Sequence, residues 1–329
     1  MKLIAFHMST LGDLLFSLPA LEALRTLPDV HLTSVVPAHY VELLATTRLA
    51  DSIVPRAMQG GWKEATSLFG RLRNAHYDTA VCFSQSRGTA IQAVGCGATR
   101  RVGFANSRWA LLLTERVRRE GPPSLANDLR LVEHLGCTPR QRDYLGFIQS
   151  TSQHKDQAGM LLRKVGIAEA PFAVIATGAS AKRSLKEWTL EGFAEVIRHL
   201  TEDRGLRCVT VGTEPPTELL ERSQGVLADL CGQTSLVQLA ALLQLAALFV
   251  GIDSGVMHLA AAMGTPVVGI FGPTSPVHTG PLGERSRVVR RELLCSPCMS
   301  SWCRIRTREC LEQLAGAEVI AALNDAHRN

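Results

Sequence analysis

The segment LFVGIDSGVMHLAAAMGTPVVGIFGPTSP, residues 248–276, is the part of the sequence that decides the fold. It begins with the apolar run Leu248–Ile252, passes through Asp253–Ser254–Gly255 into a helical stretch, and ends in a second apolar run, Val267–Phe271. Short apolar runs on either side of a helix are typical of a strand–helix–strand unit with parallel strands. We therefore predict an α/β fold, with a helix over residues 256–263 between the two strands.

The same alternation extends from this segment in both directions along the chain. Two successive series of strands and helices predict two doubly wound parallel sheets. A polar stretch before Pro171 separates the series, so we expect two Rossmann-like domains, residues 1–165 and 166–329. The other expected strands are 3–6, 32–36, 79–83, 101–104, 172–176 and 207–211, and the other expected helices are 14–27 with a restart at Pro19, 127–135, 190–204, 217–227 and 236–245.

Composition indicates a globular protein of the cytoplasm. The hydrophobic content is 46%, and 329 residues suit two domains of ordinary size. The first residues lack the features of a secretory signal, and the apolar run 239–252 is too short to cross a bilayer. Arginine clusters concentrate a net charge of +5, which suits phosphorylated substrates or anionic lipid headgroups. We expect no nucleic-acid partner, because no pattern of a nucleic-acid-binding motif is present.

The turn after the strand Leu248–Ile252 has the properties of an anion site. The first N–H groups of a helix have no partners within it, and the helix dipole favours a negative charge there, such as a diphosphate. Gly255 lets a ligand approach the main chain, Asp253 can accept hydrogen bonds from sugar hydroxyls, and His258 can donate to phosphate oxygens. A capped helix with a structural histidine has the same spacing, so the residues alone leave both interpretations open.

A second loop of this kind follows the first strand of the chain. Strand 3–6 leads through Ser9–Thr10–Leu11–Gly12–Asp13 into a helical stretch. Loops at the carboxyl ends of parallel strands lie on the ligand side of a doubly wound sheet. Asp13 at the start of the helix suits a helix cap or a general base. From the residues alone the cap is the commoner role.

Several stretches together resemble one enzyme family. Residues 251–276 closely resemble the signature of the ADP-heptose:lipopolysaccharide heptosyltransferases, glycosyltransferase family 9. Residues 231–236 resemble the turn before that signature, and Gly178–Ala179–Ser180 with Lys186–Glu187–Trp188 resembles its first C-domain loop. In the N-terminal half of the chain, Gly12–Asp13 and the Leu-Pro-Ala-Leu run after it match the family's pattern. The resemblance implies a GT-B fold, with two Rossmann-like domains facing a central cleft, the N-terminal one binding the acceptor and the C-terminal one the sugar nucleotide.

The resemblance also implies roles for individual residues. Asp13 is the expected general base, since inverting transfer needs one carboxylate to deprotonate the attacking hydroxyl. Ser180 and Lys186 are expected at the donor phosphates, where a lysine offsets charge on the departing diphosphate. Lys182 competes with Lys186, because two or so extra residues precede the latter; a surface lysine is the alternative. The other expected donor-site residues are Thr234 at the nucleoside, Glu218 or Glu214 at the ribose unless it is only a helix-face glutamate, and Asp253, Ser254, Gly255 and His258.

The reaction implied by the resemblance is a heptose transfer from ADP-heptose. It is expected to be inverting and metal-independent, with a lipid A–core glycolipid as acceptor and peripheral contact to the cytoplasmic face of the inner membrane. Arg101, with Arg100 and the loop 85–87, lies at predicted strand ends, where arginines suit acidic or phosphorylated acceptor sugars unless they are only surface residues. The alternatives are a protein O-heptosyltransferase, another sugar-nucleotide transferase, an epimerase and a non-catalytic nucleotide-binding module. Asp13 argues against an epimerase, and Asp13 together with Lys186 argues against a non-catalytic binding module.

Four of the nine cysteines lie close together near the C-terminus. A Cys-x-x-Cys pair followed by two more cysteines can place four thiolates around zinc or iron. Distant protein-directed heptosyltransferases that resemble this stretch are associated with thiolate-bound iron. Free or disulfide-capable structural thiols are the alternative interpretation. These cysteines are Cys295, Cys298, Cys303 and Cys310.

Overall fold

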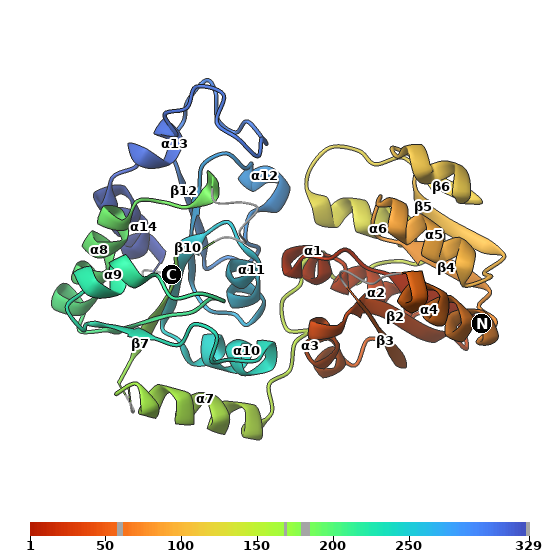
Figure 1. The fold of residues 1–329 in the computed structure, drawn as a ribbon, viewed down its shortest axis with the longest axis horizontal. Helices are drawn as coiled ribbons and strands as arrows, with labels where there is room; N and C mark the ends of the chain where they lie inside the picture. Colours follow the sequence, from red (N-terminus) through yellow and green to blue (C-terminus); the bar gives the residue numbers. More distant parts are fainter. Residues whose placement is uncertain (58–61, 168–169, 179–184, 327–329) are drawn as a thin grey trace. The chain divides into compact units, whose positions relative to one another are not determined.

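The computed structural model describes residues 1–57, 62–167, 170–178 and 185–326. They form two compact units, Met1–Gln149 and Ser150–Asn329. Each unit is built around a six-stranded parallel sheet with helices packed on it (Figure 1). The α/β class and the two doubly wound sheets are therefore confirmed. Within the described ranges, no helix combines the length and apolar character needed to span a membrane.

The first unit has the sheet order β3-β2-β1-β4-β5-β6, the order of a Rossmann fold. Its core contains Ile4 and Phe6 from the central strand and Val35 from its neighbour, all buried. The strands are β1 (Lys2–Phe6), β2 (His31–Pro37), β3 (Ser52–Arg56), β4 (Thr79–Cys82), β5 (Arg100–Phe104) and β6 (Glu115–Val117). The helices are α1 (Leu11–Phe16), α2 (Leu18–Leu24), α3 (Val41–Thr47), α4 (Trp62–Asn74), α5 (Arg87–Gly95) and α6 (Ser124–His134), with 3₁₀ turns η1 (Ala38–Tyr40) and η2 (Arg108–Leu112).

The second unit repeats this topology, with the order β12-β11-β10-β7-β8-β9. Its core joins Ile175, Val250 and Ile270 from the central strands to Phe193 on a covering helix. The strands are β7 (Phe172–Ala176), β8 (Arg207–Thr210), β9 (Leu227–Asp229), β10 (Leu248–Ile252), β11 (Val267–Phe271) and β12 (Ser286–Arg290). The helices are α7 (Ser152–Lys164), α8 (Leu190–Arg198) with the π-helical turn η4 (His199–Asp203), α9 (Thr217–Arg222), α10 (Leu236–Leu245), α11 (Gly255–Ala262), α12 (Pro276–Thr279), α13 (Glu309–Glu312) and α14 (Gly316–Ala326).

The division between the units follows Gln149, earlier than the 165/166 boundary expected from the sequence. Helix α7 accounts for the difference, because it packs against α10 of the second unit. Its Gln157 accepts a hydrogen bond from Gln238 at 3.3 Å, and its last residue, Lys164, donates to Gln233 at 3.3 Å. The polar stretch that indicated a domain boundary thus includes the exposed face of the packed helix α7.

The strands that the sequence pattern missed are the outermost strands of both sheets, β3, β6, β9 and β12. The expected helix 217–227 was correspondingly too long, because α9 ends at Arg222 and Leu227 begins β9. Outer strands have few fully buried positions, so their sequences carry no long apolar run. The central strands, which both faces of the sheet bury, were all predicted.

A tryptophan anchors the loop that follows β7. Trp188 is 4% exposed, and its Nε1 donates to the Leu314 carbonyl at 3.0 Å. Its ring meets Phe193 edge-on, with centroids 5.0 Å apart. A Cβ on Gly192 would lie 2.2 Å from Trp188 Cζ2, so only glycine lets the indole lie flat on the first turn of α8.

We predict that Gly192→Ala lowers the free energy of unfolding by about 1–3 kcal/mol, because the added methyl group must displace the buried indole. Urea unfolding followed by tryptophan fluorescence measures the change. The control is Gly70→Ala in α4, where a Cβ meets nothing within 4 Å. Equal stability of Gly192→Ala and the wild type would contradict the packing described here.

Candidate functional site

Three buried polar side chains meet at the carboxyl end of β10. Asp253 directly follows the strand and is 5% exposed. The Lys186 ammonium forms an ion pair with the Asp253 carboxylate and donates to the Asp253 carbonyl at 3.2 Å. His258 Nε2 lies 4.0 Å from Asp253 Oδ1. Three residues that the sequence analysis selected in two separate motifs thus form one cluster, while Lys182, the competitor of Lys186, lies outside the described residues.

The cluster lies beside the first turn of helix α11. Ser254 is the N-cap, and its hydroxyl accepts from the Met257 N–H at 3.5 Å. The helix begins at Gly255, so unpaired N–H groups of its first turn lie next to Asp253. The arrangement combines a helix N-terminus with a buried ammonium group, a combination that suits a diphosphate.

His258 is a neutral imidazole near pH 7. Burial lowers its pKa to about 4, with Asp253 opposing the shift and Lys186 adding to it. A neutral imidazole has one N–H donor and one acceptor nitrogen. His258 is therefore suited to a hydrogen bond with a ligand oxygen rather than to charge neutralisation.

The other residues predicted for the donor site lie outside this cluster or outside the described residues. Thr234 is partly exposed and directly precedes Ser235, the N-cap of α10. Glu218 lies on the exposed face of α9, where its carboxylate is 2.5 Å from Arg222, as expected of an ordinary helix-face glutamate. Ser180 lies outside the described residues. Three buried polar atoms in residues 272–279, directly after β11, have no hydrogen-bond partner in the described part of the chain, and their side chains were not predicted as site residues: Thr274 Oγ1, His278 Nδ1 and Thr279 Oγ1.

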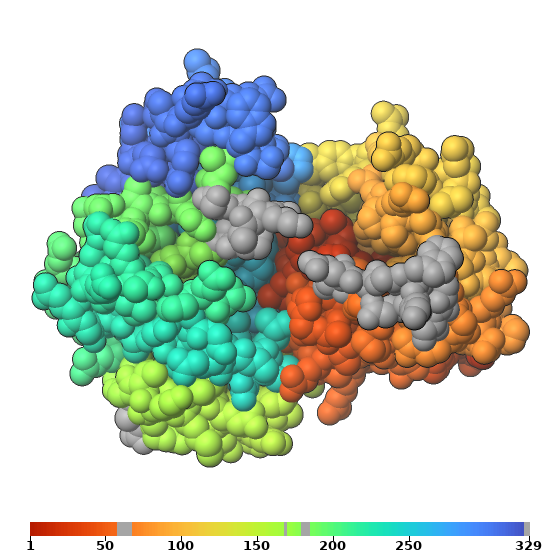
Figure 2. Space-filling model, viewed as in Figure 1, coloured from red at the N-terminus to blue at the C-terminus, as the bar shows by residue number. Residues whose placement is uncertain are grey.

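The cysteine-rich segment, residues 295–310, lies against the loop that carries Lys186. Arg308 donates to the Glu187 carbonyl. The segment lies at the surface of the second unit, where it appears in blue in Figure 2. Leu185, next to Lys186, lines a cavity of ≈ 290 Å³ together with Pro273 and all four cysteines. The segment therefore supports, from one side, the loop that carries Lys186.

The four thiols gather around this cavity without forming a metal site. Among the described residues, no three His, Cys, Asp or Glu side chains are placed to hold a metal ion. Of the two interpretations of Cys295, Cys298, Cys303 and Cys310, zinc or iron binding is therefore not supported, and the four cysteines are free thiols. Backbone hydrogen bonds, the largest contribution coming from Arg308, lower the pKa of the Cys303 thiol. The other five cysteines are buried.

The candidate base of the first unit lies in the first turn of α1. The N-cap of this helix is Thr10, so Asp13 is not the cap. The Thr10 hydroxyl accepts from the Asp13 N–H at 3.3 Å and donates to the Asp13 carboxylate. The preceding loop is held by Tyr40, which donates to the Ser9 carbonyl at 3.2 Å, and by Arg56, which donates to the Ser9 hydroxyl at 3.0 Å. Asp13, which follows buried Gly12, is thus a half-buried carboxylate in the first turn of α1, directly after the loop at the carboxyl end of β1.

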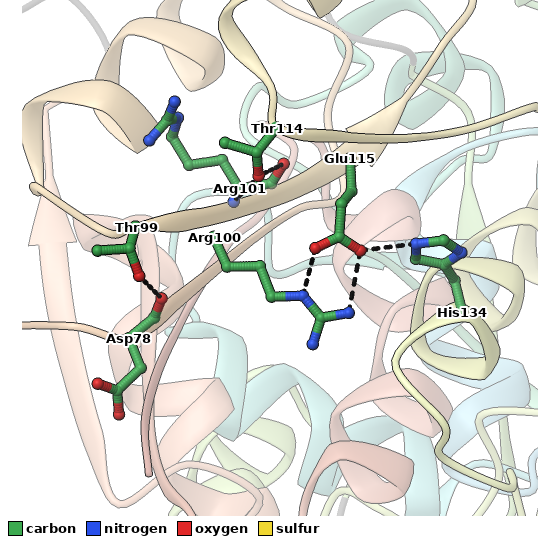
Figure 3. A network of polar contacts seen from close by, with 7 residues as sticks. All are labelled: Asp78, Thr99, Arg100, Arg101, Thr114, Glu115 and His134. Atoms are coloured by element: carbon green, nitrogen blue, oxygen red, sulfur yellow. Dashed lines mark hydrogen bonds and ion pairs between the residues drawn. The ribbon is translucent and has the colours of Figure 1, made fainter.

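The structure does not support Arg101 as a site residue. Arg101 lies near the amino end of β5, whereas Asp13 follows the carboxyl end of β1 in the same parallel sheet. Its guanidinium group donates to the carbonyls of Leu112 at 2.9 Å and Ala98 at 2.8 Å. Figure 3 shows it directed away from the neighbouring network, in which Glu115 binds Arg100 and His134. Both arginines are therefore bound to groups of the first unit itself.

A family model described as glycosyltransferase family 9 (heptosyltransferase) matches residues 65–308. The chain belongs to glycosyltransferase family 9. It is therefore an enzyme of the transferase class. The match includes Lys186, Asp253 and His258, so the cluster at α11 lies within the part of the chain that defines the family.

Curated relatives match along most of the chain. The lipopolysaccharide core heptosyltransferase OpsX of Haemophilus influenzae is 25% identical over 305 residues, 88% of this chain and 84% of that protein. Lipopolysaccharide heptosyltransferase 2 of Escherichia coli is 26% identical over 308 residues, 88% of each chain. The solved structure of the Escherichia coli ADP-heptose lipopolysaccharide heptosyltransferase II superposes with a TM-score of 0.80 at 24% identity, covering 99% of this chain and 98% of that chain. The superposition confirms the GT-B fold class.

We predict that this glycosyltransferase loses about 3–5 kcal/mol of unfolding free energy in Lys186→Met or Asp253→Leu, because either change leaves a buried charge unpaired. The double variant should lose much less than the sum of the two, since it leaves no buried charge. Urea unfolding of the four proteins gives the coupling energy. The same cycle on the exposed pair Arg222–Glu218 is the control and should couple by less than about 1 kcal/mol. Additive losses at Lys186 and Asp253 would rule out the buried pair.

Proposed function

We propose that this chain transfers heptose from ADP-heptose to a hydroxyl of an inner-core lipopolysaccharide acceptor. The observation that carries the proposal is the Lys186–Asp253–His258 cluster beside the first turn of α11, inside the matched family segment. The relatives named above act in lipopolysaccharide synthesis, which supports the acceptor class. An acceptor of this kind places the enzyme at the cytoplasmic face of the inner membrane, as a peripheral protein.

The second unit binds the donor in this proposal. The diphosphate accepts hydrogen bonds from the first N–H groups of α11, at Ser254 and Gly255, and from His258. The Lys186 ammonium offsets the charge that the departing ADP gains, so transfer needs no divalent metal. Asp253 then accepts hydrogen bonds from sugar hydroxyls. Thr234 and Ser180 complete the donor site at the nucleoside and the phosphates.

Asp13 is the general base of the proposed reaction. Its carboxylate removes the proton of the acceptor hydroxyl as that oxygen attacks the anomeric carbon of the heptose. The carbon–oxygen bond to ADP breaks on the opposite face, so the configuration inverts. The Thr10 hydroxyl donates a hydrogen bond to one oxygen of the Asp13 carboxylate, and this keeps the carboxylate in position to accept the proton.

Release of ADP tests the proposed function directly. The protein is incubated with ADP-heptose and a lipid A–core acceptor that lacks heptose, and free ADP and the heptosylated lipid are measured. Parallel reactions use a peptide acceptor or no acceptor. Acceptor-dependent ADP release with the lipid supports the proposal, whereas transfer to the peptide alone assigns a protein O-heptosyltransferase.

We predict that Asp13→Asn lowers kcat by about 10²- to 10⁴-fold, because the amide cannot take the proton. The affinity for ADP-heptose, measured by calorimetry, should stay within about threefold of wild type, because Asp13 lies in the other unit. Asp29→Asn on the same unit, at an exposed position, is the control and should turn over normally. Normal turnover of Asp13→Asn would remove Asp13 from the mechanism.

A further inference from the structure

Large apolar side chains are exposed together in the loop between β12 and α13. Leu294 is fully exposed and Trp302 is 62% exposed, and Met299 and Ile305 are 55% and 48% exposed. Elsewhere in the described chain such side chains are spread over many elements, as Met160 is on α7. Single exposed apolar residues need no explanation, whereas a group of them marks an interaction surface.

The loop that carries these side chains is held by polar contacts to the second unit. The Ser296 hydroxyl donates to the Gly272 carbonyl at 2.6 Å, and the Met299 N–H donates to the Pro273 carbonyl at 2.8 Å. These contacts use hydroxyl and main-chain groups, so they leave the large apolar side chains in solvent. Figure 1 shows the loop extending beyond the sheet of this unit.

The exposed apolar residues lie around one hollow. Leu294 and Ile305, from opposite ends of the loop, line the cavity of ≈ 290 Å³ that also contains the cysteines. Met299 directly follows one lining residue, Cys298, and Trp302 directly precedes another, Cys303. The two ends and the middle of the loop thus belong to one continuous surface.

The charge of the same loop is positive. Residues 293–308 contain three arginines and no aspartate or glutamate. Arg308 lies 3.4 Å from the Glu312 carboxylate, which partly offsets its charge. Arg304 and Arg306 are exposed, and neither forms an ion pair within the described part of the chain. Two unpaired guanidinium groups therefore lie among the exposed apolar side chains.

This combination fits the surface of a bilayer that contains anionic lipids. Arginines are attracted to negatively charged headgroups, a tryptophan ring is favoured at the boundary between water and lipid, and leucine, methionine and isoleucine enter the acyl region. A stable protein interface needs about twenty residues from each partner, which is more than the exposed side chains of this loop supply. A bilayer has no such requirement, because a few apolar residues and charges suffice for reversible binding.

We propose that this loop docks the second unit on a bilayer with anionic headgroups. Its docking surface consists of Leu294, Met299, Trp302 and Ile305, which enter the lipid, and Arg304 and Arg306, which contact the headgroups. The inference deepens the proposed function and rests on it, since an acceptor anchored in a membrane requires an enzyme that reaches that membrane. The docking itself involves neither substrate.

Vesicle binding tests the docking surface in the absence of both substrates. The protein is sedimented with vesicles of phosphatidylcholine alone and with vesicles that also contain phosphatidylglycerol. The wild type should bind the second kind about tenfold more tightly or better, and added salt should weaken this binding because it screens exposed charges. Absent binding, or equal binding to both kinds of vesicle, would overturn the proposal.

Substitutions separate the two contributions of the docking surface. Replacing both apolar residues in Leu294→Ser/Trp302→Ser should lower the vesicle partition coefficient by about tenfold or more. Replacing either arginine, in Arg304→Gln or Arg306→Gln, should lower it by about fivefold on anionic vesicles and leave it unchanged on phosphatidylcholine. Thermal unfolding should stay at the wild-type temperature, because all four side chains are exposed.

Helix α7 of the same unit supplies a matched control. Met160 and Arg163 are both exposed there, an apolar side chain and an arginine three residues apart. Met160→Ser/Arg163→Gln should bind vesicles as the wild type does. If this control loses as much binding as the loop variants, or if the loop variants bind normally, the loop is not the docking surface.

Tryptophan quenching by brominated lipids shows whether the loop enters the bilayer. Bromine quenches an indole that reaches the acyl region, so anionic vesicles of brominated lipid should reduce the emission of the wild type. Trp302→Phe keeps an apolar ring and should still bind, but its emission should no longer be quenched. Quenching that persists in Trp302→Phe would place the contact elsewhere and overturn the proposal.

The transfer assay separates this inference from the proposed function. Loop variants should act normally on a water-soluble core oligosaccharide and slowly on the lipid acceptor in vesicles. A wild type that binds vesicles through the loop but transfers no heptose would overturn the proposed function and leave the docking surface in place. A protein that does not bind vesicles, and whose dimerisation in light scattering is abolished by Trp302→Ser, would assign the surface to a second copy of the chain and overturn docking on lipid.

Discussion

The buried ion pair between Lys186 and Asp253 is the interaction on which the candidate donor site depends. It joins the loop after β7 to the end of β10, two neighbouring strands of the second sheet. Ionised groups that are removed from water need partners with good geometry, so the pair fixes both segments. The loop is held again from its other side, by Trp188 on the Leu314 carbonyl and by Arg308 on the Glu187 carbonyl. The cysteine-rich segment is thus part of the packing that supports the loop carrying Lys186.

The strands that could be predicted from the sequence are those buried on both faces. A strand such as β10, Leu248–Ile252, is apolar throughout because helices cover both sides of its sheet. The outer strands could not be found in this way. β3 contains a proline and β6 contains charged residues, because the solvent-facing edge of a sheet favours groups that block further pairing.

The residues of the candidate site likewise differ in whether the local sequence could predict them. Asp253, Ser254, Gly255 and His258 are adjacent in sequence, so a strand, a turn and a helix start place them together. Lys186 could be assigned to the site only through the family resemblance. It lies 67 residues from Asp253 in the sequence, and nothing in its local sequence shows that its ammonium group is buried against that residue. Arg101 lies near the amino end of β5, as the expected strand 101–104 already implied, whereas ligands bind at the carboxyl ends of the strands in such a sheet.

The central claim is that the second unit binds the sugar nucleotide at the Lys186–Asp253 pair, and calorimetric titration with ADP-heptose tests it most directly. We expect one binding site on the wild-type protein and an affinity lower by about tenfold or more in a folded Lys186→Met variant, because the diphosphate loses its ammonium partner. An exposed lysine of the same unit, changed in Lys155→Met, serves as the matched control and should bind as the wild type does. Binding of unchanged affinity to a folded Lys186→Met protein would contradict the account.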